Sequence, residues 1–402
     1  MDKLKQIACK VIDDESEQLQ MISNEIWQHR ELAFLELKSH ASLTQVLEDK
    51  GFDVERHHKL ETAFVARWGD NEDESSKNNS KKPHIAVICE YDALPDIGHA
   101  CGHNLIAEIG VGAGLAIKTA MQQSELSLGK LSIIGTPAEE AGGGKIDLLK
   151  AGVFDDVDVA MMSHPAPFTD ARPIFLGGKR FMANFHGRAS HAAGYPWEAV
   201  NALDAAVLAY MNVAALRQQM RPEWRASAII TKGGTRTNII PDETQLALQV
   251  RAPIDSEVKA LEAKVKTCVH AAATATGCTV DIVDLPKPYE CLVTNETLAR
   301  LYETNGSLVG VAFPPQMPKK VLGSTDMGNV SHHVPSLHPT YHCDTDAINH
   351  THEFNAAAGS PEAQPSTLAQ AKALAMVALD IFQQPQLLES IREDFQNDLN
   401  RL

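Results

Sequence analysis

The residues best suited to chemistry follow three short apolar runs of the sequence. Cys101 and His103, separated by one glycine, come shortly after the apolar run 84–89 and offer a thiolate and an imidazole from one tight turn. Such a pair suits a borderline-soft divalent ion such as zinc. Taken alone, the fragment is equally compatible with a buried cysteine beside surface histidines. The other two runs decide between these interpretations.

Two adjacent carboxylates, Glu139 and Glu140, follow the apolar run 131–134. Neighbouring side chains in extended backbone point to opposite sides, so one carboxylate can bind a metal while the other faces a metal-bound water. The alternative is the acidic first turn of a helix, which the helix dipole would stabilise. Pro137 before the pair and the glycines at 142–144 after it favour a loop of defined conformation over the first turn of a helix.

A histidine, His164, follows the third apolar run, 157–162, and precedes a proline that restricts its backbone. A lone histidine in such a place is more often a core residue than a ligand. Three consecutive runs that each end in metal-competent side chains would rarely arise by chance, so the joint pattern predicts a metal site. Spacing alone does not choose the C-terminal ligand among His338, His342, His350 and His352.

The elements that must position these residues are strands of a parallel sheet. The three apolar runs are short, and helical patterns at about 104–121 and 145–151 separate them. Buried strands that alternate with helices predict an α/β fold with a mixed, mostly parallel sheet and helices on both faces. Such sheets bind ligands at the carboxyl ends of their strands, which is where the candidate residues fall.

An inserted domain is predicted at 179–289. The strand and helix patterns in this range follow the order β-α-β-β-α-β, which matches the ferredoxin-like split βαβ unit. The α/β pattern then resumes and ends in a long helix at 368–382. We therefore expect a catalytic metal-binding domain built from 1–178 and 290–402, with a smaller α+β domain inserted between these two segments.

The composition excludes several classes of function. The chain has 402 residues, 36 Lys and Arg against 52 Asp and Glu, a net charge of −16 and 44% hydrophobic residues. This composition is typical of a globular protein with a large core, and its acidity disfavours nucleic acid and anionic membranes as partners. No apolar run suits a secretory signal or a bilayer span, and the seven cysteines are an odd, scattered set. We expect a cytoplasmic protein that acts on small molecules.

Six ordered motifs resemble the metal-dependent aminoacylase, carboxypeptidase and amidohydrolase family over about 20–385. They are EYDALPDIGHACGHN, TPAEEAGGG, SHPAP, FHGRASHAA, GGTRTNIIPDE and GSTDMGNVS. The first motif is most similar to the branch of the β-alanyl-lysine dipeptidases and the bacterial aminobenzoyl-glutamate hydrolases. Auxin-conjugate and hippurate hydrolases are less similar, because their motif usually ends in Asp where this chain has Asn104.

The resemblance implies a zinc-aminopeptidase-like catalytic domain and a ferredoxin-like lid that also forms a homodimer. It implies two divalent ions, Zn²⁺ or Mn²⁺, and the following ligands: Cys101, His103, Glu140, His164 and His350, with His338 and His352 as weaker alternatives to the last. Asp92 matches a carboxylate near the metals that is either a ligand or a support.

The resemblance also implies the residues that act on the substrate. Glu139 matches the general base of the family. His191 and Asn238 match lid positions that hold the substrate carboxylate or the developing oxyanion, often from a dimer partner.

The function that follows from the resemblance is metal-dependent hydrolysis of the amide bond in small dipeptides. The expected substrates carry a β-alanyl or γ-aminobutyryl group and a basic C-terminal residue such as lysine or ornithine. The acidic net charge weakly favours a cationic substrate. One alternative is an amidohydrolase of N-acyl amino acids or aminobenzoyl-glutamate. Another is a catalytically silent binding or regulatory protein with the same fold, which the presence of Glu139 and every expected ligand type disfavours.

Overall fold

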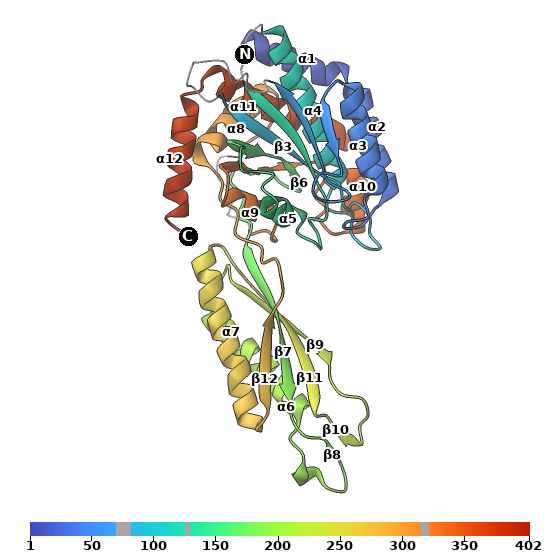
Figure 1. Ribbon diagram of the computed structural model, residues 1–402, viewed down its shortest axis with the longest axis vertical. Coiled ribbons are helices and arrows are strands. Elements are labelled where there is room, and N and C mark those ends of the chain that lie inside the picture. The colour runs from blue at the N-terminus through green and yellow to red at the C-terminus, as the bar shows by residue number, and fades with distance from the viewer. Residues whose placement is uncertain (70–81, 125–128, 315–320) are drawn as a thin grey trace. The chain divides into compact units, whose positions relative to one another are not determined.

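The computed structural model of the chain describes residues 1–69, 82–124, 129–314 and 321–402 (Figure 1). The chain divides into two compact units. The larger unit contains Met1–Pro173, Val293–Lys320 and Asn329–Arg401, and the inserted unit contains Ile174–Leu292, Val321–Gly328 and Leu402. The boundaries predicted from the sequence, 179 and 289, lie inside the first segment of the inserted unit.

The larger unit is built on a six-stranded mixed sheet with the order β1-β2-β4-β3-β5-β13. Its strands are β1 (Asp53–Arg56), β2 (Phe64–Gly69), β3 (His84–Glu90), β4 (Lys130–Thr136), β5 (Val159–Met161) and β13 (Ser336–Leu337). The neighbours from β4 to β13 run parallel, whereas β1 and β2 are antiparallel to their neighbours. Strand β3 is buried along its whole length, as expected for the centre of a sheet covered on both faces.

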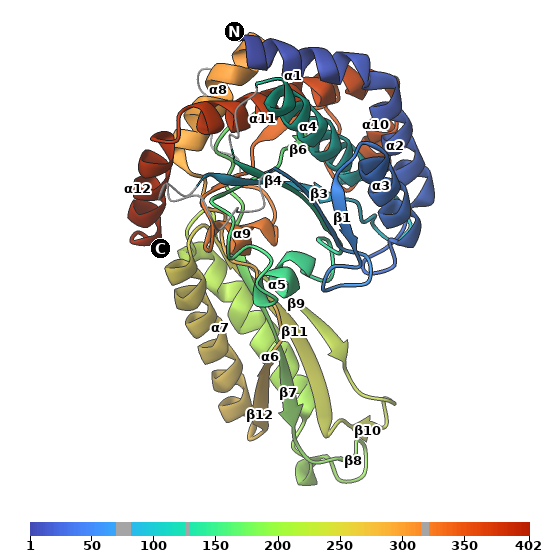
Figure 2. The ribbon, with the colours of Figure 1, turned by 45° about the horizontal axis from the view of Figure 1, so that its top comes forward.

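Helices cover both faces of this sheet, which confirms the predicted α/β class. Figure 2 shows α1, α4 and α11 over one face and α5 on the other. The helices of the larger unit are α1 (Lys3–Asp14), α2 (Ser16–His29), α3 (Leu37–Asp49), α4 (His103–Gln123), α5 (Gly144–Lys150), α8 (Glu296–Leu308), α10 (His352–Ala358), α11 (Gln364–Gln383) and α12 (Leu387–Leu399). Helix α9 (Met327–Ser331) begins with the last two residues of a segment of the inserted unit and continues with the first residues of a segment of the larger unit.

The central helix α4 contacts the sheet at positions where it carries glycine. A Cβ atom on Gly110 would lie 2.3 Å from the Cys89 Sγ atom, and one on Gly114 would lie 2.2 Å from Ile133 Cδ1. By length and composition α4 could cross a membrane, but 94% of its most apolar window is buried inside the protein. It is therefore a core helix, and its N-terminus is held at the carboxyl end of β3.

Two short strands and a single-turn helix complete the larger unit. Strands β6 (His164–Ala166) and β14 (Thr340–His342) pair in parallel, and η3 (Pro361–Ala363) precedes α11. The pairing places the segment after β5 beside the segment after β13.

The inserted unit is a four-stranded antiparallel sheet with two helices. The strand order is β12-β7-β11-β9, with β7 (Gly177–His186), β9 (Arg225–Lys232), β11 (Glu243–Ala252) and β12 (Thr279–Asp284). Helices α6 (Ala202–Ala215) and α7 (Asp255–Thr276) pack with the sheet around a separate apolar core. The chain order of these six elements confirms the predicted β-α-β-β-α-β order. Shorter elements are β8 (Ser190–His191), β10 (Ile239–Ile240), η1 (Pro196–Glu198) and η2 (Leu216–Gln219).

Candidate metal centre

Cys101 and His103 lie at the turn that leads from β3 into α4. Gly102 forms this turn with a φ of +79°, a left-handed conformation that glycine adopts readily. A Cβ atom at Gly102 would also lie 2.5 Å from Pro165 Cγ, the proline that follows His164. The glycine thus lets the thiol turn approach the strand that carries His164.

Glu139 and Glu140 lie in the loop between β4 and α5. Helix α5 begins only at Gly144, so the pair is part of a shaped loop and not the acidic first turn of a helix. Glu139 is 7% exposed, and the side chain of Glu140 is 10% exposed. Both carboxylates are therefore largely shielded from water.

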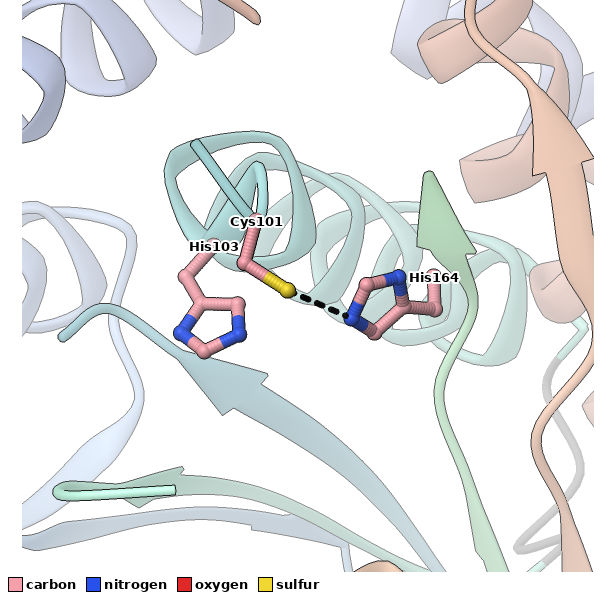
Figure 3. A group of neighbouring side chains, drawn as sticks. All are labelled: Cys101, His103 and His164. Carbon is pink, nitrogen blue, oxygen red and sulfur yellow. Dashed lines mark hydrogen bonds between the residues drawn. The ribbon is translucent and has the colours of Figure 1, made fainter. Parts of the chain in front are cut away.

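These residues converge at the carboxyl ends of the strands. Ligand atoms lie within 4.8 Å of one another in three overlapping groups: Cys101 with His103 and His164, Cys101 with Glu140 and His350, and His103 with Glu139 and Glu140. Figure 3 shows the thiol of Cys101 directed at the His164 ring, with 3.4 Å between Sγ and Nε2. The structure thus brings together the five predicted ligands and the predicted base.

His350 is the C-terminal histidine that belongs to these groups. It precedes α10, its φ is +68°, and its backbone N–H donates to the Ala100 carbonyl over 2.8 Å. The two alternatives lie differently: His352 begins α10, while His338 is buried with its ring stacked 5.7 Å from the His164 ring. Within the described residues, neither His338 nor His352 joins a metal-competent group.

Asp92 supports the group through both of its carboxylate oxygens. Its Oδ1 atom lies 2.9 Å from His103 Nδ1, and its Oδ2 accepts the backbone N–H of Glu140 over 3.0 Å. A carboxylate on one ring nitrogen of a histidine orients the other nitrogen toward a metal. This geometry fits the supporting role, which the sequence left open against the role of a ligand.

The electrostatics of the group favour a bound cation. Burial raises the pKa of the Cys101 thiol well above its usual range, and the nearby Glu140 carboxylate adds to the increase. Burial, and after it the neighbouring His103 ring, lower the pKa of His164 to about 4. Burial is the largest single effect on the pKa of His103 and lowers it, but Asp92 and Cys101 together outweigh burial and raise this pKa well above its usual range. Without a metal, the Cys101 thiol and the His103 ring therefore carry protons. A divalent ion that binds there would displace these protons.

Two buried polar atoms give an independent test of the fit. His103 Nε2 and Glu90 Oε2 lie 3.5 Å apart in fully buried side chains, and no described residue forms a hydrogen bond with either. Buried polar atoms are normally paired, so this arrangement calls for a further group. A thiolate, imidazoles and carboxylates together form a donor set for zinc or a similar borderline ion.

Sequence reasoning missed two residues beneath the group, Glu90 and Lys145. Their side chains are fully buried and form an ion pair between the end of β3 and the start of α5. Glu90 stands at the carboxyl end of an apolar strand, which is a usable signal. No pattern in the sequence indicates that Lys145 is buried, because lysine side chains are almost always exposed to solvent.

His191 and Asn238 lie in the inserted unit, whereas the residues above lie in the larger unit. His191 is in β8 and pairs with Ile239, and the Asn238 carbonyl accepts the backbone N–H of Ala192 over 3.0 Å. The His191 Nδ1 atom accepts two backbone N–H groups, from Ala193 at 3.2 Å and Gly194 at 2.9 Å. Because Nδ1 is an acceptor, the ring proton is on Nε2, which can donate to an oxyanion.

Comparisons with known proteins agree with this architecture. Residues 176–276 match the model of the peptidase dimerisation domain. The chain is 45% identical to the Xaa-Arg dipeptidase of Mus musculus and 44% identical to that of Homo sapiens, over 98% of this chain and 93% and 92% of those proteins. It is 32% identical to one component of the p-aminobenzoyl-glutamate hydrolase of Escherichia coli, over 65% of this chain and 56% of that protein.

Solved structures show the same fold at low sequence identity. An aminohydrolase of methicillin-resistant Staphylococcus aureus matches with a TM-score of 0.78 at 19% identity, over 94% of this chain and 99% of that chain. A dinuclear metal-binding peptidase of Bacillus subtilis matches with a TM-score of 0.69 at 19% identity, over 91% of this chain and 99% of that chain.

The fold, the site and these relatives define a hydrolase of amide or peptide bonds with a metal-competent group at its strand ends. The resemblance drawn from the six motifs is confirmed. The chain belongs to the M20 peptidase family.

Proposed function

We propose that the chain is a two-metal dipeptidase that releases a basic residue from the C-terminal position of a dipeptide. The observation that carries this proposal is the convergence of Cys101, His103, Glu140, His164 and His350 beside the carboxylate of Glu139. The names of the mouse and human relatives support arginine and similar basic residues at the C-terminal position. The N-terminal group would be β-alanyl or γ-aminobutyryl.

The five converging residues would hold the metals, Zn²⁺ or Mn²⁺. Bound there, two divalent ions would supply Lewis-acid polarisation of the scissile carbonyl and a lowered pKa for the attacking water. Asp92 keeps the His103 ring oriented and fixes the backbone of Glu140, so two of the ligands are held in place by one buried carboxylate.

Glu139 would act as the general base and then as the general acid. It would take a proton from the attacking water and return it to the leaving amine. Its Oε2 atom lies 4.0 Å from His103 Nε2, so it borders the ligand group. His191, with its proton on Nε2, would stabilise the developing oxyanion, and Asn238 would help to hold the substrate carboxylate.

A substrate panel on metal-defined protein tests this proposal. Metal-free protein reloaded with zinc or manganese should release lysine, ornithine or arginine from β-alanyl and γ-aminobutyryl dipeptides. Glu139→Gln should lower kcat by about a hundred- to ten-thousandfold with unchanged metal content, whereas Glu393→Gln, at an exposed position of α12, should not. Unchanged hydrolysis in Glu139→Gln would rule out the mechanism.

A second substrate class enters the same panel. The relative from Escherichia coli is named a p-aminobenzoyl-glutamate hydrolase, which favours including aminobenzoyl-glutamate and N-acyl amino acids. Cleavage of these compounds without release of basic residues would replace the dipeptide part of the proposal. Absence of any metal-dependent cleavage would instead favour a silent binding protein.

We also propose that the chain forms a homodimer through the inserted unit. Strand β9 is an edge of its sheet and exposes Ile229 and Ile230, and α6 exposes an apolar set that comprises Val207, Leu208, Tyr210 and Met211. Exposed apolar residues on an edge strand and a helix are typical of an interface. Ile229→Lys should produce monomers in analytical ultracentrifugation, whereas Val283→Lys on the opposite edge strand β12 should not.

A further inference from the structure

The residue before Glu139 has a backbone conformation that L-residues rarely adopt. Ala138 has a φ of +61°, and its side chain is fully buried. The left-handed conformation brings Cβ close to the following carbonyl oxygen, so it is unfavourable for any residue except glycine. It persists only where the surroundings hold it. The two carboxylates of the site follow this residue directly.

A buried carboxylate from the N-terminal part of the chain, Glu36, holds Ala138. The Ala138 N–H donates to Glu36 Oε1 over 2.9 Å. The same oxygen accepts the Phe34 N–H over 3.0 Å, and Oε2 accepts the Thr62 hydroxyl over 2.7 Å. Glu36 is fully buried, so these hydrogen bonds form away from water, where they are strongest.

The Ala138 carbonyl is held as well, by the other end of the same loop. The N–H groups of Gly142 and Gly143 donate to it over 3.0 and 2.8 Å. The loop that carries Glu139 and Glu140 therefore begins and ends at hydrogen bonds to the backbone of Ala138. The exchange rates of these two glycine amides report directly on whether the loop is closed.

Buried carboxylates hold the backbone on both sides of Glu139. Glu36 accepts the N–H of Ala138, and Asp92 accepts the N–H of Glu140. The two N–H groups flank the residue whose carboxylate must face the attacking water. Asp92 also contacts a ligand ring, whereas the contacts described for Glu36 are with Phe34, Thr62 and Ala138.

We propose that Glu36 is a positioning residue for the reaction. Its carboxylate keeps Ala138 left-handed, and the left-handed residue directs Glu139 and Glu140 into the site together. The inference rests on the proposed function, because it takes the roles of those two carboxylates from there. Glu36 acts through Ala138 and not on the substrate.

Substitutions at both ends of the hydrogen bond test the inference. Glu36→Ala should lower kcat by about ten- to a hundredfold with little change in KM, because the loop then samples other conformations. Glu36→Gln should stay within about threefold of wild type, because its amide oxygen still accepts the Ala138 N–H while its NH2 group donates to Thr62. Metal content and thermal unfolding are measured for every variant.

A double-mutant cycle separates positioning from general stabilisation. Glycine adopts the left-handed conformation readily, so Ala138→Gly should reduce the dependence of the loop on Glu36. The fall in kcat that Glu36→Ala causes should therefore shrink by about tenfold when Ala138→Gly is already present. A role in stability alone predicts the same fall with and without Ala138→Gly.

Amide hydrogen exchange of the metal-free protein provides a readout apart from activity. Exchange at Gly142 and Gly143 should accelerate in Glu36→Ala and slow again in the Glu36→Ala/Ala138→Gly double variant. Glu31→Ala is the matched control, because the Glu31 carboxylate accepts the Lys38 and Ser39 N–H groups at the start of α3. It should lower the stability without a change at the two glycines.

The outcomes keep the inference apart from the proposed function. Equal loss of kcat with and without Ala138→Gly, together with unchanged exchange at Gly142 and Gly143, overturns the positioning role. If the wild-type protein hydrolyses none of the substrates, the proposed function is wrong. The exchange measurement then still decides whether Glu36 holds the loop.

Discussion

The Nε2 atom of His350 lies 3.3 Å from the Oε1 atom of Glu140. The histidine comes from the segment before α10 and the glutamate from the loop after β4. His350 is half-exposed, whereas Glu140 is largely buried, so the contact forms at the rim of the group. This contact, and the nearby thiol of Cys101, distinguish His350 from the other C-terminal histidines.

Loss of His350 should weaken metal binding. His350→Ala should lower the zinc affinity by at least about tenfold, because one donor of the group is removed while the others stay in place. His352→Ala, two residues further at the start of α10, is the matched control and should keep the affinity of the wild type. Competition with a chelating dye measures both. A larger effect of His352→Ala would contradict the choice of His350.

Metal binding should release protons. The pKa values of Cys101 and His103 both lie well above their usual ranges, so both groups are protonated at neutral pH in the absence of a cation. Because a ligand must lose its proton, these two groups should together release about two protons per chain at pH 7, and the metal affinity should rise with pH. Calorimetry in buffers of different ionisation enthalpy measures the number of protons released on metal binding.

The Cys101→Ser variant refines this measurement. It removes the thiol proton, so one proton fewer should be released on metal binding. Identical proton release in the variant and the wild type would show that Cys101 does not bind the metal as a thiolate.

The buried pair of Lys145 and Glu90 should be essential for stability. Lys145→Met removes the cation that contacts Glu90 Oε1 and leaves the His103 ring, 3.5 Å from Oε2, as the remaining positive group, which should lower the free energy of unfolding of the metal-free protein by about 3–5 kcal/mol. Adding Glu90→Gln removes the charge and should restore part of the loss. Urea unfolding measures each variant.

An exposed pair provides the control for Lys145. Lys10 and Asp14 form an i,i+4 ion pair with exposed fractions of 72% and 60%, so Lys10→Met should change the free energy of unfolding by only about 0.5 kcal/mol. Similar effects of the two substitutions would contradict the assigned role of the buried pair.

Glu108 should make the stability fall as the pH rises. This residue of α4 is buried, Gln364 donates to it over 3.1 Å, and burial raises its pKa to about 7. The folded protein therefore binds the Glu108 proton more tightly than the unfolded chain, whose carboxyl titrates near 4.5. Its stabilising contribution is complete below about pH 4.5 and is lost as the pH rises through about 7.

Glu108→Gln removes this dependence. Relative to wild type, the variant should gain about 2–3 kcal/mol in the free energy of unfolding between pH 5 and pH 8. Glu393→Gln serves as the exposed control. Parallel stability curves for Glu108→Gln and wild type would contradict the prediction.

The fold was accessible from the sequence because its signals are local. The apolar runs that became β3, β4 and β5 and the helical pattern of α4 depend on neighbouring residues only. The order β-α-β-β-α-β of the inserted unit was accessible for the same reason. Since parallel strands direct their carboxyl ends to one edge, the sequence also indicated where Cys101, Glu140 and His164 would meet.

Other relationships were decided by the tertiary structure. The sequence offered several C-terminal histidines at comparable spacing, and only the path of the chain before α10 brings His350 to Glu140. The sequence did not show whether Asp92 is a metal ligand or a support. In the structure, one oxygen of its carboxylate contacts His103 and the other accepts the backbone N–H of Glu140, which fits the supporting role.

The sequence by itself determined the α/β class, the family and the motifs that carry the chemistry. The tertiary structure decided which buried charges support them: Lys145 beneath Glu90, and Glu36 against Ala138. From the sequence alone, a charged residue is expected to be exposed to solvent. Lys145 and Glu90 are 55 positions apart, and Glu36 and Ala138 are 102 positions apart. Such pairs form only when packing excludes water around them, and that depends on the whole fold and not on any local pattern.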